Sequence, residues 1–323
     1  MRGGRVRSGR DEGSGRRGHS RASSAGPRLG MVALVAALLW VSLAPSAVAE
    51  ENAAAKQLRI AGSGTLLPIV EGLAKAFGET HPGVSVQIES RGSSSGPPAL
   101  LAERADLAAM SRPFNDAERQ AFLRRHGDEP RRVVVAIDAV AVFVNEDNPL
   151  RALTLGQVDA IFSDTRRCGA PKALEIWNDV GVGGKLDGRR IRLFGRNQRS
   201  GTRAWFREAA LCGGLFRPEL RERPGADSLA LSIAESATGI GYGSLAVSRA
   251  PGVRPIPLAR RAGEKAVLPE SEHVDAGAYP LTRELYLYAS PAASEPVIAD
   301  FLALAVSERG QQIAEAAGFF GVR

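Results

Sequence analysis

The sequence is poor in the residues that most often carry catalysis or bind metals. Its 323 residues include only two cysteines and four histidines. It also lacks a Gly-x4-Gly-Lys-Ser/Thr loop, which excludes a P-loop nucleotide site. No catalytic constellation stands out, so we expect a protein that is not an enzyme and that holds no cofactor or metal.

The sequence also has no apolar run long enough to span a membrane. The uncharged stretch 31–43 falls short of the ~20 residues that a spanning helix needs. Basic residues precede it within 1–30, and a small-x-small site, Ala47 and Ala49, follows it. This order is typical of a cleavable secretory signal. We therefore expect residues 1–49 to be a signal peptide and the mature protein to be periplasmic or extracytoplasmic.

The positive charge belongs to this leader rather than to the mature chain. Residues 1–49 contain eight arginines and two acidic residues, so removing them lowers the formal net charge from +7 to about +1. Bulk charge of this size gives no case for nucleic-acid binding.

Both cysteines, Cys168 and Cys212, lie in the mature part. In an exported protein such a pair is more often a disulfide than a metal site or a nucleophile. We therefore predict a Cys168–Cys212 disulfide.

The stretch 194–204 carries the clearest functional signal. A short, partly apolar run, 189–194, precedes it and predicts a strand, and helical spacing of apolar residues follows it. A helix that opens on Ser200-Gly201-Thr202 offers hydroxyls, unpaired N–H groups and the positive end of its dipole. Arg196 adds a guanidinium that can grip two oxygens. This stretch predicts one wall of an oxyanion site.

Three short strands in the first part of the chain each leave through a small polar turn. Such an alternation indicates an α/β lobe with a mainly parallel sheet, in which ligands lie beyond the carboxyl ends of the strands. The three turns should therefore share an edge. The strands are 58–61, 84–88 and 106–110, and the turns are 62–65, 92–96 and 111–112.

Two apolar segments predict crossings between lobes. The segment 133–145 is too long for one ordinary strand, and we expect Asp138 to break it. The second crossing is 279–288, and one closing helix is expected over 297–317. We predict one lobe from 50–138 with 284–323, a second lobe from 139–283, and a cleft between them that closes on a ligand.

Six motifs in this order resemble the extracytoplasmic phosphate-binding proteins of phosphate ABC transporters, the PstS-like family. The resemblance covers essentially the whole mature chain. The motifs are Gly62-Ser63-Gly64-Thr65, Gly92-Ser93-Ser94-Ser95-Gly96, Arg196 with Ser200-Gly201-Thr202, Gly239-Ile240-Gly241-Tyr242, Tyr279-Pro280-Leu281-Thr282-Arg283 and Ser307-Glu308-Arg309-Gly310-Gln311.

This resemblance implies a two-lobe, type II periplasmic-binding-protein fold and capture of inorganic phosphate. It also implies a monomer that delivers phosphate to the membrane permease of an ABC transporter. Carried over by position, the ligand-binding residues would be Gly64, Thr65, the backbone of Leu66, Ser93, Arg196, Ser200, Gly201 and Thr202.

One position departs from the family pattern. Some members have an aspartate after the third strand, where a carboxylate can accept the proton of hydrogen phosphate, but this chain has Ser111. We hypothesise that Asp138 is the acceptor instead; a purely structural hinge carboxylate is the alternative.

Two other functions stay open at this point. The ligand could be another oxyanion, such as sulfate, molybdate, tungstate or a phosphonate. Alternatively, Gly92-Ser93-Ser94-Ser95-Gly96 fits a Gly-x-Ser-x-Gly elbow, so Ser94 could be the nucleophile of a secreted serine hydrolase, with His126 or His273 as its base.

Overall fold

The computed structural model describes residues 56–290 and 295–322. The predicted signal peptide, 1–49, lies outside them. Within these ranges no helix is long and apolar enough to cross a membrane.

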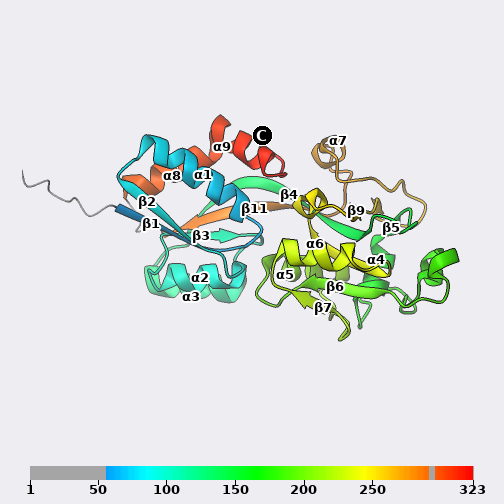
Figure 1. Ribbon diagram of the computed structural model, residues 1–323. Helices are drawn as coiled ribbons and strands as arrows, with labels where there is room; N and C mark the ends of the chain where they lie inside the picture. The colour runs from blue at the N-terminus through cyan, green and yellow to red at the C-terminus, as the bar shows by residue number, and fades with distance from the viewer. Residues whose placement is uncertain (1–55, 291–294, 323) are drawn as a thin grey trace, which may run out of the picture. The chain divides into compact units, whose positions relative to one another are not determined.

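One mixed β-sheet organises the described residues (Figure 1). Its strand order is β2-β1-β3-β11-β4-β8-β6-β7, with β9 also paired to β4. β1 runs parallel to β2 and β3, and β6 runs parallel to β7 and β8. Between these two parallel groups, β11 and β4 pair antiparallel with their neighbours. The strands are β1 (Lys56–Gly62), β2 (Val84–Glu89), β3 (Leu107–Met110), β4 (Arg131–Asn145), β6 (Arg192–Arg196), β7 (Arg221–Arg223), β8 (Gly239–Ser244), β9 (Val253–Pro255) and β11 (Thr282–Ala289), and a separate pair is β5 (Leu153–Thr154) with β10 (Leu258–Ala259).

Helices cover both faces of the first group of strands (Figure 1). Successive side chains of a strand point to opposite faces. Accordingly, Leu107 and Ala109 of β3 pack with helices α1, α8 and α9, and Ala108 and Met110 pack with α2 and α3. The helices are α1 (Leu67–Thr80), α2 (Gly96–Leu101), α3 (Asp116–His126), α4 (Leu155–Phe162), α5 (Gly201–Leu211), α6 (Ala226–Ala234), α7 (Ser271–Asp275), α8 (Pro296–Val306) and α9 (Glu308–Ala316).

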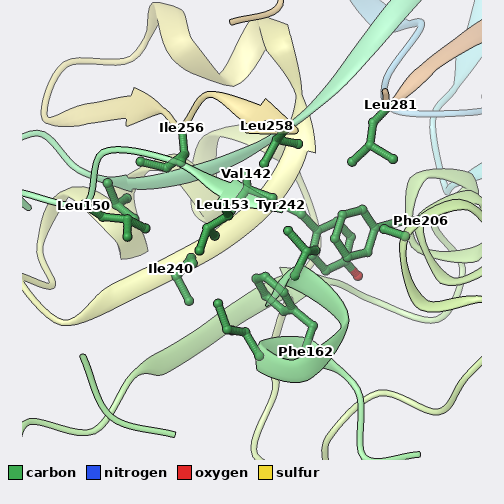
Figure 2. Packing of buried hydrophobic residues seen from close by; sticks show 14 of the residues in the cluster. Val142, Leu150, Leu153, Phe162, Phe206, Ile240, Tyr242, Ile256, Leu258 and Leu281 are labelled. Atoms are coloured by element: carbon green, nitrogen blue, oxygen red, sulfur yellow. The ribbon is translucent and has the colours of Figure 1, made fainter. Parts of the chain in front are cut away.

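The second half of the molecule repeats this arrangement around β4. Val140 and Val142 belong to a core that includes residues of α4 and α5, whereas Phe143 packs with α6. Figure 2 shows the first of these cores, where the rings of Phe206 and Tyr242 stack with centroids 4.0 Å apart. Helix α5, which carries the predicted anion wall, is therefore anchored by a large aromatic contact.

The long apolar segment forms one unbroken strand, so the predicted break at Asp138 was wrong. β4 has 15 residues and changes partner just beyond Asp138. It pairs with β11 as far as Ala139 and with β8 from Val140 onward. The strand continues because Arg283 of β11 forms a buried ion pair with the carboxylate, which offsets the cost of burying it.

The expected closing helix is instead two helices, α8 and α9. Between them Ser307 is extended, and its hydroxyl accepts the N–H of Gly310 at 3.2 Å. At Gly310 a Cβ would lie 2.1 Å from the carbonyl oxygen of Leu304, so the two helices approach closely at this glycine. The apolar spacing continues across Ser307, which is why the periodicity alone predicted one helix.

The predicted disulfide between Cys168 and Cys212 is present, with Cα atoms 5.4 Å apart. It joins the loop after α4 to the C-terminus of α5. Both cysteines of the sequence are thereby paired.

Candidate anion-binding site

The three polar turns of the first half meet at the carboxyl ends of their strands, as the sequence predicts. Ser93 and Ser111 follow β2 and β3, and their hydroxyl oxygens lie 3.1 Å apart. The backbone N–H of Ser111 also donates to the Ser93 hydroxyl, at 3.1 Å. The turn after β1 is closed by a hydrogen bond from the N–H of Thr65 to the hydroxyl of Ser63. All four side chains are buried.

Helix α5 brings its first turn to this cluster from the other half of the molecule. Ser200 is extended and caps the helix, because its hydroxyl accepts the N–H of Arg203. Thr202 lies opposite Thr65, with the two hydroxyl oxygens 3.0 Å apart. The N–H of Arg203 is used by this cap, whereas the N–H groups of Gly201 and Thr202 have no preceding helical carbonyl to bond and are available to an anion.

Gly201 allows this close approach. A Cβ at this position would lie 2.2 Å from the hydroxyl oxygen of Ser93 and 2.6 Å from that of Ser111. Any larger residue would therefore push α5 away from the turns. The glycine is needed here for space, since its backbone is not in the left-handed region.

Arg196 supplies a buried positive charge at the end of β6. One terminal nitrogen donates to the carbonyl of Pro224 at 3.1 Å, and Nε is buried without a partner. Burial lowers the pKa of Arg196, and the nearby charge of Arg283 lowers it further. Its Nη2 would lie 3.6 Å from a Cβ on Gly64, so the guanidinium lies beside the polar turn that follows β1. A desolvated guanidinium with a free N–H is suited to an anionic oxygen.

A second buried arginine, Arg283, lies behind the hydroxyls. Its Nε and Nη2 donate to Oδ2 of Asp138 at 3.0 and 2.7 Å. Nη1 donates to the carbonyl of Ser111 at 2.9 Å, and Nη2 also donates to the Thr202 hydroxyl at 2.8 Å. The other oxygen of Asp138 accepts from Ser244. Burial lowers the pKa of Arg283, whereas Asp138 opposes this shift.

Sequence reasoning missed Arg283 as a site residue. A signal was present, because a charged residue stands within the apolar crossing 279–288 and such a charge must find a partner when it is buried. The sequence could not show which carboxylate would pair with it.

Most of the predicted residues come together and the hydrolase residues do not. Leu66 is buried at the N-cap of α1, next to Thr65. Arg112, in the turn after β3, forms an ion pair with Glu118. Ser94 is exposed, while His126 lies against the ring of Phe122 and His273 contacts the carbonyl of Leu268.

A cavity of about 740 Å³ lies on the Arg283 side of the cluster. It is lined by Ser94 and Arg283, together with the aromatic side chains of Phe114, Trp205 and Tyr286, and none of Thr65, Ser93, Arg196 and Thr202 lines it. Among the residues that the structure describes, no group of His, Cys, Asp and Glu could hold a metal ion. The polar groups of the cluster that can bind an anion are its hydroxyls, the N–H groups of Gly201 and Thr202, and the Nε–H of Arg196.

Comparison with known proteins agrees with this geometry. The family model described as the PBP superfamily domain matches residues 47–309. The phosphate-binding protein PstS of Pseudomonas aeruginosa is 41% identical over 261 residues, which are 80% of each chain.

Two solved structures share the fold. A phosphate ABC transporter substrate-binding protein from Clostridium perfringens has a TM-score of 0.70 at 23% identity, covering 83% of this chain and all of its own. An ABC-type phosphate transport receptor from Vibrio cholerae has a TM-score of 0.64 at 21% identity, covering 82% and 100%. The expected two-lobe α/β fold is confirmed, and the chain belongs to the PBP superfamily, within the PstS family of solute-binding proteins.

Proposed function

We propose that this protein is an extracytoplasmic solute-binding protein that captures inorganic phosphate and delivers it to the permease of an ABC transporter. The observation that carries this proposal is the convergence of Thr65, Ser93 and Thr202 beside the guanidinium of Arg196, whose Nε has no partner. The Pseudomonas relative is a phosphate-binding protein, and the Clostridium protein was solved with bound phosphate.

Several modest donors account for useful affinity better than one charge does. Micromolar binding requires about 8 kcal/mol. A charge-assisted hydrogen bond contributes about 1.5–3 kcal/mol net, and a partly buried helix N-terminus contributes up to ~2 kcal/mol. The proposed ligand set, which includes Arg196, five hydroxyl-bearing residues and the N–H groups of Gly201 and Thr202, is sufficient. Its members are Gly64, Thr65, Leu66, Ser93, Ser111, Asp138, Arg196, Ser200, Gly201 and Thr202.

Within this set, Asp138 is the proposed acceptor for the proton of hydrogen phosphate. Its Oδ2 accepts two hydrogen bonds from Arg283, but Oδ1 accepts only the one from Ser244. A carboxylate oxygen has two lone-pair sites, so Oδ1 can accept one more hydrogen bond, which the proton of hydrogen phosphate would donate. Sulfate has no proton to give and would face this charge directly.

The proposed lobes, 50–138 with 284–323 and 139–283, are consistent with the packing. Tyr279 and Leu281 belong to the core around α5, whereas Leu285 and Leu287 belong to the core around α1. The partner change of β4 after Ala139 falls at the other boundary. We expect the exported protein to be a monomer without affinity for nucleic acid.

Competition calorimetry on the mature, anion-depleted protein tests the function. We expect micromolar or tighter binding of phosphate and displacement of bound phosphate by its close mimics. The affinities of sulfate, molybdate, tungstate and a phosphonate are measured in the same way. If one of these binds more tightly than phosphate, the oxyanion assignment changes, and if none binds, the proposal fails.

Two adjacent serines provide a matched pair of variants. Ser93→Ala removes a buried hydroxyl of the cluster, and we expect phosphate affinity to fall about 10-fold, since one such bond contributes about 1.5 kcal/mol. Ser94→Ala removes an exposed hydroxyl and should leave phosphate affinity unchanged. If a fluorophosphonate does not label Ser94, the alternative function of a serine hydrolase is also excluded.

A further inference from the structure

Arg283 connects three separate parts of the candidate site. It lies on β11, and its guanidinium reaches Asp138 on β4, the carbonyl of Ser111 after β3, and the hydroxyl of Thr202 in α5. The Arg283 side chain is only 1% exposed. A guanidinium is planar and rigid, so these contacts hold their partners in fixed directions.

The contact with Thr202 decides which way its hydroxyl hydrogen points. A guanidinium has donors and no acceptor. The oxygen of Thr202 must therefore accept from Arg283, and its own hydrogen must point elsewhere. The oxygen of Thr65 lies 3.0 Å from that of Thr202, and either hydroxyl can be the donor between them, so the Thr202 hydrogen is left to point to Thr65 or to a ligand.

The contact with Ser111 acts on Ser93 through the backbone. Arg283 holds the carbonyl of Ser111, and the N–H of the same residue donates to the hydroxyl oxygen of Ser93. The Ser93 oxygen therefore accepts from Ser111, and the Ser93 hydrogen is left to donate to the Ser111 hydroxyl, 3.1 Å away, or to a ligand. One guanidinium thus constrains two hydroxyls, Thr202 directly and Ser93 through the Ser111 backbone.

The charges of the two buried arginines are used differently. Arg283 is paired with Asp138, so its charge is largely neutralised within the protein. Arg196 forms no ion pair with a carboxylate of the described residues, and its Nε has no partner. The net charge offered to a ligand therefore comes from Arg196.

We propose that Arg283 is a positioning residue of the anion site, which turns the hydroxyls of Thr202 and Ser93 into hydrogen-bond donors toward the ligand. This proposal rests on the proposed function, since it assumes that an oxyanion binds at these hydroxyls. Arg283 itself does not touch the anion.

A double-mutant cycle on phosphate affinity tests it. Arg283→Lys keeps the charge beside Asp138 but loses the fork that also holds Ser111 and Thr202. We expect a loss of about 10- to 100-fold in phosphate affinity, as for one or two charge-assisted bonds. In a Thr202→Val background the same substitution should cost clearly less, because one of its targets is gone. A Thr202→Ser background keeps the hydroxyl, so Arg283→Lys should there lower phosphate affinity by the same factor as in the wild-type background.

Arg254 provides the matched control. It also holds backbone carbonyls, those of Asn148 and Leu150, but it lies on β9 outside the hydroxyl cluster. Arg254→Lys should leave phosphate affinity within about twofold of wild type, whatever its effect on stability.

The outcomes separate the two proposals. Absence of phosphate binding by the wild-type protein would refute the function, whereas wild-type binding with equal costs of Arg283→Lys in all three backgrounds would refute the positioning role. If Arg283→Lys does not fold, as judged by circular dichroism with excess phosphate, the neutral pair Asp138→Asn/Arg283→Gln replaces it and is compared with Asp138→Asn alone, so that the loss of the carboxylate is common to both. If that pair does not fold either, the role of Arg283 is structural and the positioning role is refuted.

Discussion

Two buried aspartates show how differently the same side chain is used in this molecule. Asp138 has an arginine and a serine as partners. Asp159, in α4, accepts the N–H of Cys168 through Oδ2, but its Oδ1 is buried without a partner. The first is a stable charge near the site, and the second is a cost to folding.

Asp138→Asn should weaken the preference for phosphate over sulfate. The amide removes the negative charge that sulfate would face, and it leaves Arg283 with a full unpaired charge. We expect the ratio of sulfate to phosphate dissociation constants to fall about 10-fold or more, in line with the loss of one charge-assisted bond. Competition calorimetry measures this ratio, and an unchanged ratio would show that Asp138 does not discriminate between the two anions.

Asp159 should make stability decrease as pH rises. Burial raises the pKa of Asp159 in the folded state above its ordinary value, with the N–H of Cys168 opposing this in part. The unfolded chain then releases the proton first, so the free energy of unfolding falls as pH increases from the ordinary carboxyl range through the folded pKa.

Asp159→Asn removes this titration. We therefore expect the stability of the variant relative to wild type to be greater at pH 7 than at pH 4, as measured by urea denaturation at both values. An equal difference at the two pH values would contradict the burial argument.

At the scale of elements, close packing decides where helices begin and end. Helices α8 and α9 are separated by Ser307, and the second begins with a capped turn. This break lets Gly310 lie against the last carbonyls of α8. A continuous helix could not make this contact.

Gly310→Ala should destabilise the protein by about 1–3 kcal/mol, as overpacking does elsewhere. Its Cβ would lie 2.1 and 2.6 Å from the carbonyl oxygens of Leu304 and Ala305. Gly78→Ala in α1 is the control, because its Cβ meets nothing within 4 Å. Alanine at this position should raise the free energy of unfolding by about 0.5–1 kcal/mol. Urea denaturation distinguishes the two, and equal effects would mean that the α8–α9 contact is looser than described.

At the scale of the whole molecule, the disulfide restricts the unfolded chain. Cys168 and Cys212 are 44 residues apart, and closing a loop of this length contributes about 4 kcal/mol on the chain-entropy model. The double variant Cys168→Ser/Cys212→Ser should lose stability of this order in chemical denaturation.

Reduced wild-type protein serves as the control and should lose a similar amount. Labelling of the native exported protein with a thiol reagent should find no free cysteine. Two reactive thiols would contradict the pairing.

The sequence by itself determined those features that depend on near neighbours in the chain. Ser200-Gly201-Thr202 predicts a capped helix start, and the polar turns after three short strands predict a shared edge, because parallel strands align their carboxyl ends. Both are observed. The cysteine pairing also followed, since the chain has only two.

Only the tertiary structure decided what depends on contacts between distant residues. Asp138 was expected to break β4, but Arg283, 145 residues further along the chain, neutralises it. The same contact places Arg283 beside the candidate anion site, and Arg196 forms no ion pair with a carboxylate of the described residues. Periodicity cannot report such choices, because the energy of a buried charge depends on the partner that folding brings to it.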